Sequence, residues 1–245
     1  MMNWTISPLG DRALVAELSV EAAGDSWVQV GAAADWLRQA NVPWIIDLIP
    51  AYTTLTIMYD PIHVWKLAAQ RNGLTVYEMA VRTVQGLLES VGNRSEQTAR
   101  WMDVPVCYGG EFGPDLEQSA ERSGMRVEQF VQAHAAGAYT VALVGFVPGF
   151  PYLAGLPAQL AQPRRDNPRA RVPAGSVAIG GGQTGIYPLD VPGGWQLIGR
   201  TPLRLFDADK TEPALLRAGD IVRFVPIDEE RFLALEAEEA AARER

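Results

Sequence analysis

The sequence predicts an α+β protein of two domains, an N-terminal two-layer α/β sandwich of ferredoxin type followed by a β-barrel domain. In the first hundred residues, segments with helical apolar spacing alternate with short runs of strand character. From Tyr139 to Pro226, short strand-like runs alternate with Gly/Pro turns, which is typical of a closed or partly closed barrel. The polar run Gly92–Thr98 separates the two patterns. We therefore expect domains at 1–98 and 99–227 and an acidic, solvated helix at 228–245.

The elements of the N-terminal domain follow from the period of their apolar residues. A helix shows apolar positions three and four residues apart, and a half-buried strand shows every second one. Asn41-Val-Pro43 is expected to end the first helix. In chain order, the predicted elements are the turn Pro8–Asp11, strand Ala13–Leu18, helix Asp25–Gln39, strands Ile45–Ile49 and Thr53–Tyr59, and helices His63–Gln70 and Val76–Val91.

The second domain is expected to begin with a strand at Arg100–Tyr108, in which alternate residues would face opposite sides. Two short helices are predicted at Asp115–Ser123 and Arg126–Ala136. Asp115-Leu-Glu-Gln118 has the spacing of a capping box for the first of them. Barrel strands such as Val177–Ile179 then follow.

Composition limits the class of protein. The chain has 245 residues, 48% of them hydrophobic, which is enough for a sizeable core. Its N-terminus lacks the features of a signal peptide, and we expect no membrane span. Cys107 is the only cysteine, which excludes an internal disulfide and favours a reducing, cytoplasmic location. A net charge of −8 argues against nucleic acid as a partner.

The window Gly145–Pro202 is the most informative part of the chain. It holds 11 of the 23 glycines and 9 of the 17 prolines, together with several aromatic residues. Glycine permits close backbone approach and proline fixes φ, so turns of this kind, joined by buried aromatics, favour a shaped binding surface. The candidate site is therefore expected in this window.

Charge in the same region points to an anionic ligand. Between Gly145 and Phe206 there are six arginines and two aspartates, a net charge of +4, and the rest of the chain carries −12. Arginine offers a planar fork of donors that matches carboxylates and phosphates. The alternative is that Arg164–Arg171 is simply a solvated loop edge.

Familiar catalytic patterns are missing or incomplete. Gly180–Gly185 matches G-x-G-x-x-G after a strand, but Pro188 follows where a dinucleotide fold needs a helix. Cys107 is interpreted as a core residue, and Ser176 does not lie in a nucleophile elbow. His134 is a weak candidate for a general base, with a hydrogen-bonded, non-catalytic histidine as the favoured alternative. No residue spacing indicates a metal site.

The window contains four distinctive motifs. They are Gly-Phe-Val-Pro-Gly-Phe-Pro-Tyr-Leu (145–153), Val-Pro-Ala-Gly-Ser-Val (172–177), Gly-Gly-Gln-Thr-Gly-Ile-Tyr-Pro (181–188) and Pro-Gly-Gly-Trp-Gln-Leu-Ile-Gly-Arg-Thr-Pro (192–202). These motifs resemble the allophanate hydrolase subunit 1 family, which includes the B subunit of 5-oxoprolinase and KipI, a sporulation kinase inhibitor. Val104–Glu117, Leu205–Asp207 and Ala218–Phe224 look like flanking segments of the same family, the last two like its closing strands.

The resemblance implies an N-terminal ferredoxin-like domain and a cyclophilin-like β-barrel. It implies an enzyme subunit, inactive alone, that acts with the A subunit of 5-oxoprolinase and with the C subunit, which is of allophanate hydrolase subunit 2 type. Such a complex cleaves 5-oxoproline to glutamate with ATP, and ATP is expected at the level of the complex. The alternative is a KipI-like inhibitor of a sensor histidine kinase. A weaker alternative is a carboxyltransferase-type component acting on urea-like or allophanate-like substrates.

The same motifs supply candidate site residues, and simple barrel core is the alternative role for the aromatic ones. Polar contacts to the substrate are expected from Gln183, Thr184, Tyr187, Arg171, Arg200 and Thr201, and pocket walls from Phe146, Phe150 and Trp195.

Overall fold

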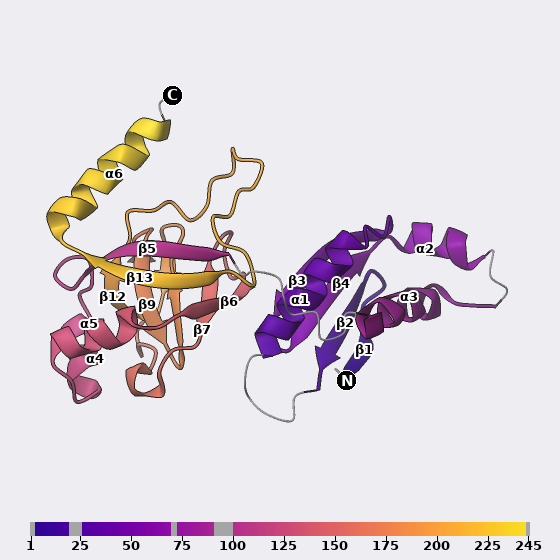
Figure 1. The fold of residues 1–245 in the computed structure, drawn as a ribbon, viewed down its shortest axis with the longest axis horizontal. Coiled ribbons are helices and arrows are strands. Elements are labelled where there is room, and N and C mark those ends of the chain that lie inside the picture. The colour runs from indigo at the N-terminus through magenta and orange to yellow at the C-terminus, as the bar shows by residue number, and fades with distance from the viewer. Residues whose placement is uncertain (1–2, 20–25, 70–72, 91–99, 244–245) are drawn as a thin grey trace. The chain divides into compact units, whose positions relative to one another are not determined.

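The structure is a computed structural model that describes residues 3–19, 26–69, 73–90 and 100–243. It divides into two compact units, Met1–Thr98 and Ala99–Arg245, which are described separately below (Figure 1). The expected boundary run, Gly92–Thr98, lies outside the described residues. The predicted α+β class, with a sandwich followed by a barrel, is confirmed.

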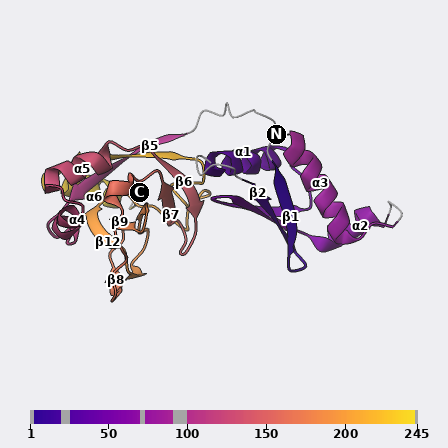
Figure 2. The same ribbon diagram turned by 90° about the horizontal axis from the view of Figure 1, so that it is seen from below.

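The first unit is an antiparallel four-stranded sheet in the order β1-β2-β4-β3 with helices packed on it (Figure 2). Leu55, Ile57 and Tyr59 of β4 are buried, as the alternation in the sequence predicts. They form one core with apolar residues of α1 and α3. The elements are β1 (Trp4–Leu9), β2 (Ala13–Leu18), α1 (Ser26–Gln39), β3 (Ile45–Ala51), β4 (Thr54–Tyr59), α2 (Pro61–Ala68) and α3 (Val76–Ser90).

Strand β1 was not expected from the sequence. Its residues Pro8 and Leu9 fall in the segment interpreted as a turn, yet Pro8 pairs with Leu14 of β2. Proline is tolerated here because β1 is the edge of the sheet and one side of the strand needs no ladder partner. The chain reverses instead around Gly10, whose φ of 65° is readily adopted by glycine.

The second unit is built on a closed barrel in the order β10-β7-β6-β13-β5-β12-β9, with β9 paired back to β10. Strands β8 and β11 form a separate two-stranded sheet, and β8 extends away from the barrel in Figure 2. Its elements are β5 (Trp101–Tyr108), α4 (Leu116–Arg122), α5 (Val127–Ala135), β6 (Tyr139–Val144), β7 (Pro151–Ala154), β8 (Arg169–Val172), β9 (Ser176–Gly180), β10 (Gln183–Ile186), β11 (Val191–Gly193), β12 (Gln196–Arg200), β13 (Ile221–Ile227) and α6 (Glu229–Arg243).

Strand β13 closes the barrel by pairing in parallel with β5. Leu205–Asp207, the other segment expected as a closing strand, forms only an isolated bridge between Phe206 and Ala214. Leu205 is buried in the barrel core, so this segment contributes packing rather than a ladder. The expectation of a strand there was wrong.

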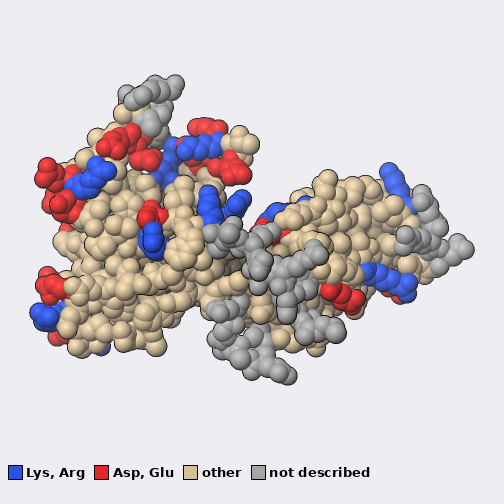
Figure 3. Space-filling view, in the orientation of Figure 1, with Lys and Arg blue, Asp and Glu red and all other residues tan. Residues whose placement is uncertain are grey.

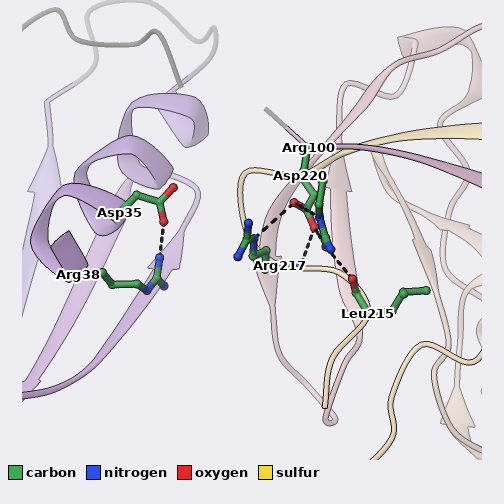
Figure 4. Close-up of polar contacts among 6 residues, drawn as sticks. All are labelled: Asp35, Arg38, Arg100, Leu215, Arg217 and Asp220. Carbon is green, nitrogen blue, oxygen red and sulfur yellow. Dashed lines mark hydrogen bonds and ion pairs between the residues drawn. The ribbon is translucent and has the colours of Figure 1, made fainter. Parts of the chain in front are cut away.

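Buried Asp220 anchors the start of β13 to the start of β5. Its carboxylate accepts a hydrogen bond from Arg100 Nε at 3.0 Å, and Arg100 also donates to the Leu215 carbonyl at 2.7 Å. Figure 4 shows Arg100 and Arg217 turned toward Asp220. The same figure shows an exposed pair inside α1 of the other unit, in which Arg38 donates to Asp35 at 2.6 Å. The Asp220 cluster is the stronger constraint because its carboxylate is buried.

The predicted capping box at Asp115 was wrong. Asp115 is the N-cap of α4, but its side chain makes no capping hydrogen bond. Its carboxylate is instead occupied by two arginines and by the amide of Leu197. Elsewhere, no helix in the described residues combines the length and apolar character that crossing a bilayer requires.

Candidate functional site

An aromatic cavity of about 310 Å³ lies on the barrel unit. Its walls come from the turn after β6, from β7, from the segment before β8 and from the segments around β11. The cavity therefore gathers residues that span fifty positions of the glycine- and proline-rich window. The lining residues are Phe146, Phe150, Tyr152, Arg164, Arg165, Pro168, Tyr187, Pro192, Gly193, Gly194 and Trp195.

Phe150 is the centre of an aromatic cluster in this cavity. Its ring centroid lies 4.8 Å from that of Tyr152, 5.1 Å from Tyr187 and 5.5 Å from Trp195. The rings meet edge to face or tilted, which are the favourable geometries for aromatic pairs. Because each ring is held by its neighbours, the cavity wall is preformed.

Glycines make room for these rings. A Cβ at Gly180 would lie 2.5 Å from the Trp195 indole, and one at Gly193 would lie 2.4 Å from the Tyr187 hydroxyl oxygen. Contacts this short cannot form without displacing a ring. Close packing of the backbone on aromatic rings therefore explains why glycine occupies these two positions.

Phe146 holds a strained position at the rim. Its φ is 71°, in the left-handed region, and its side chain is 63% exposed. A non-glycine residue there costs about 1–2 kcal/mol. Its ring makes an edge contact with Phe150 at 5.7 Å. A strained, exposed aromatic at the mouth of a cavity is an arrangement that ligand binding would explain.

We expect the Phe146→Gly variant to be more stable than Phe146→Ala by about 1 kcal/mol. Both variants remove the same ring, but only glycine relieves the left-handed backbone. Thermal unfolding of the two proteins side by side measures the difference. Equal stability of the two variants would show that the backbone at this position carries no strain.

Two arginines bring positive charge to the aromatic wall. The Arg164 guanidinium carbon lies 5.9 Å from the Trp195 ring centroid, within the range of a cation–π contact. Arg164 and Arg165 also line a second cavity of about 270 Å³. Among the described residues, Arg164 has no carboxylate within ion-pair distance. Its charge is therefore available to an anionic ligand.

Asp115 fixes the loop that carries these arginines. One carboxylate oxygen accepts from Arg165 at 3.2 Å and from Arg169 at 2.7 Å. The other oxygen accepts from the Leu197 amide at 2.7 Å. Asp115 is only 5% exposed, so these charge-assisted bonds form in a poorly solvated place. The carboxylate therefore links the start of α4 to the loop before β8, to the first residue of β8 and to β12.

The cavity brings together four of the residues expected from the sequence. Phe146, Phe150 and Trp195 form its walls, and Tyr187 is also in the lining. Burial raises the pKa of Tyr187, and of Tyr152 beside it, so both phenols remain neutral hydrogen-bond donors near pH 7.

The other expected polar residues do not line this cavity. Thr184 and Thr201 are buried, and Gln183 is half-buried on β10. Arg171 Nε donates to Asp190 at 2.8 Å on the surface. Arg200 Nε donates to the Ala174 carbonyl at 3.0 Å, and its guanidinium lies over the Phe232 ring.

His134 lies in the barrel core and lines neither cavity. Its Nδ1 is 2.8 Å from the Tyr108 hydroxyl, and its Nε2 is 3.0 Å from the Thr184 hydroxyl, which donates to the Ala178 carbonyl. That last bond assigns the proton to Nε2, with Tyr108 donating to Nδ1. Burial lowers the pKa of His134 to about 3. These contacts fit a neutral, hydrogen-bonded core histidine, the alternative given above.

Arg164, Arg165 and Tyr152 were not singled out as site residues from the sequence. The arginine excess of the window was the available signal, but spacing alone does not separate Arg164 and Arg165 from the surface-paired Arg171. The described residues contain no cluster of three or more metal-ligating side chains.

The aromatic rings and arginines that line the first cavity can together bind a flat ring that carries a negative charge.

Charges on the view of the barrel unit in Figure 3 are mixed. Acidic and basic side chains gather over its upper part around α6, and fewer appear lower down. The two signs are interspersed on this face. This face therefore presents no broad patch of one sign.

The chain matches a known protein family over most of its length. Residues 4–216 match the model described as "Carboxyltransferase domain, subdomain C and D". The 5-oxoprolinase B subunit of Bacillus subtilis (strain 168) is 43% identical over 238 residues, 97% of this chain and 98% of the relative. That of Escherichia coli O157:H7 is 42% identical over 218 residues, 89% of this chain and 94% of the relative.

A solved structure shares the fold. The crystal structure of TTHA0988 is 35% identical and superposes with a TM-score of 0.72 over 89% of this chain. The match covers 40% of the TTHA0988 chain, so the present chain spans less than half of that protein.

Proposed function

Since the chain belongs to the family of the carboxyltransferase domain, subdomain C and D, we propose that it serves as the B subunit of an ATP-dependent 5-oxoprolinase. The observation that carries the proposal is the 43% identity to a relative of that name over 97% of this chain and 98% of the relative. The proposed reaction opens the lactam of 5-oxo-L-proline to L-glutamate, with hydrolysis of ATP.

The aromatic cavity suits this substrate. 5-Oxoproline is a small five-membered lactam with a carboxylate, and a cavity of about 310 Å³ can enclose it. The ring would lie against Phe150 and Trp195, and the carboxylate would face the fork of Arg164. The neutral Tyr152 and Tyr187 hydroxyls can donate to the lactam carbonyl. This chain would thus bind and orient the ring.

ATP and the bond-breaking groups are assigned to the complex. Among the described residues, the cavity lining contains no cysteine, serine, histidine or carboxylate that could act as nucleophile or base. We assign these tasks to the partner A and C subunits, and expect this chain to be inactive alone. A cytoplasmic location belongs to the same proposal.

The test is ATP-dependent release of glutamate from 5-oxoproline. The reaction is run with this chain, with its cognate A and C subunits, and with all three together. The proposal expects glutamate only from the complete mixture. If well-folded proteins release no glutamate above background in any mixture, the proposal fails, and inhibition of a histidine kinase becomes the function to assay.

A further inference from the structure

The second cavity, about 270 Å³ in volume, is distinct in chemistry from the aromatic one. Its walls come from α4, from the loop before β8 and from β12. The lining holds three arginines and three side-chain amides against one acid. The residues are Gln118, Arg122, Pro163, Arg164, Arg165, Asp166, Asn167 and Gln196.

We propose that this second cavity is a binding site for a phosphate-class anion. Arg122 and Arg164 have no carboxylate partner in the described part of the chain, and Asp115 is shared between Arg165 and Arg169. A single carboxylate compensates only one of the two positive charges of Arg165 and Arg169. With Asp166 counted against Arg122 and Arg164, the cavity retains an excess of positive charge, which favours an anion.

The number of donors favours phosphate over a carboxylate. Elsewhere in this protein a carboxylate pairs with one arginine, as Asp190 does, or with two, as Asp115 does. Three guanidinium forks and the amide groups of Gln118 and Asn167 offer more donors than two carboxylate oxygens can accept. A phosphate or phosphate ester presents three or more terminal oxygens and up to two charges.

Gln196 supplies an unsatisfied acceptor at the same wall. It is 2% exposed, and its Nε2 donates to the Pro163 carbonyl at 2.9 Å. Its Oε1 is buried and accepts no hydrogen bond from the described residues. Such an orphan costs about 1–3 kcal/mol. The hydroxyl of a singly protonated phosphate can donate a hydrogen bond to this Oε1 if the amide turns toward the cavity. Sulfate and carboxylate carry no such proton near neutral pH.

Arg164 and Arg165 line both cavities, so the anion would sit beside the aromatic site. It is either free inorganic phosphate or the phosphate of a larger ligand whose apolar part occupies the aromatic cavity. Phosphate binding here is independent of the proposed reaction. A failure here would leave the glutamate assay untouched, because binding is measured on this chain without turnover.

Isothermal titration of the full chain with inorganic phosphate at constant ionic strength tests the site. We expect saturable binding that Arg122→Gln weakens about tenfold or more. The control Arg126→Gln removes a neighbouring exposed arginine outside the cavity and is expected to bind as the parent does. Asp166→Asn is expected to bind several-fold more tightly. No saturable binding, or equal loss in the Arg122 and Arg126 variants, would overturn the proposal.

Phenyl phosphate distinguishes the two sources. Tighter binding than inorganic phosphate, with the gain lost in Phe146→Gly, would identify a ligand that spans both cavities. Equal affinity for the two compounds would identify free phosphate as the ligand.

Discussion

Replacing Asp115 with alanine is expected to lower the free energy of unfolding by about 2–4 kcal/mol. The carboxylate is buried, and its loss leaves Arg165, Arg169 and the Leu197 amide without their acceptor. The repulsion between the two arginines is then uncompensated. Because Arg165 and the loop before β8 line both cavities, binding in each is expected to weaken as well.

Asp190→Ala is the matched control, since it also removes a carboxylate bound to an arginine. The Arg171–Asp190 pair is exposed, with side chains 78% and 40% accessible, so its loss should cost less than about 1 kcal/mol. Urea unfolding of both variants at pH 7 makes the comparison. Equal destabilisation would contradict the role given to Asp115.

The His134→Gln variant is expected to change how stability depends on pH. The pKa of His134 is lowered in the folded protein, so the unfolded chain binds a proton that the native chain excludes. Its contribution is complete above pH 6.5 and is lost as the pH falls toward about 3. Between pH 7 and pH 4 this amounts to roughly 3 kcal/mol.

Glutamine can keep hydrogen bonds to Tyr108 and Thr184 but does not titrate. It loses the stacking of the imidazole on the Phe224 ring, whose centroid lies 4.6 Å away, so the variant is less stable than the parent at pH 7. Because only the parent loses stability through the titration of His134, this disadvantage shrinks or reverses by pH 4. Urea unfolding of both proteins at pH 7, 6, 5 and 4 follows the difference, in which titration of the carboxylates cancels. Parallel curves would show that His134 gains a proton in the native protein, or that it is not buried.

The elements could be predicted from the sequence where one physical rule dominates. Leu55, Ile57 and Tyr59 alternate without interruption, and Val76–Ser90 keeps helical spacing, so both appear near the predicted bounds. Pro8 misled the prediction because its effect depends on whether a strand lies at an edge, which is a property of the sheet. Asp115 misled it because a distant pair of arginines competes for the same carboxylate.

The candidate site was predictable in its walls and less so in its charges. Glycine and aromatic residues at fixed spacing indicate close packing, and Phe146, Phe150, Tyr187 and Trp195 meet in one cavity. Which arginines point into it depends on pairing across the fold. Arg171 finds Asp190, Arg169 finds Asp115, and Arg164 finds no acid among the described residues. The spacing of residues along the sequence does not predict these ion-pair partners, because they are distant in the chain.

The most direct test of the central claim is the KM for 5-oxoproline in the reconstituted complex. With Arg164→Gln in this chain, we expect KM to rise about tenfold or more, because a charge-assisted contact to the carboxylate is lost. The control Arg126→Gln should keep the parental KM. An unchanged KM in the Arg164 variant, in a complex that turns over normally, would contradict placement of the substrate in the aromatic cavity.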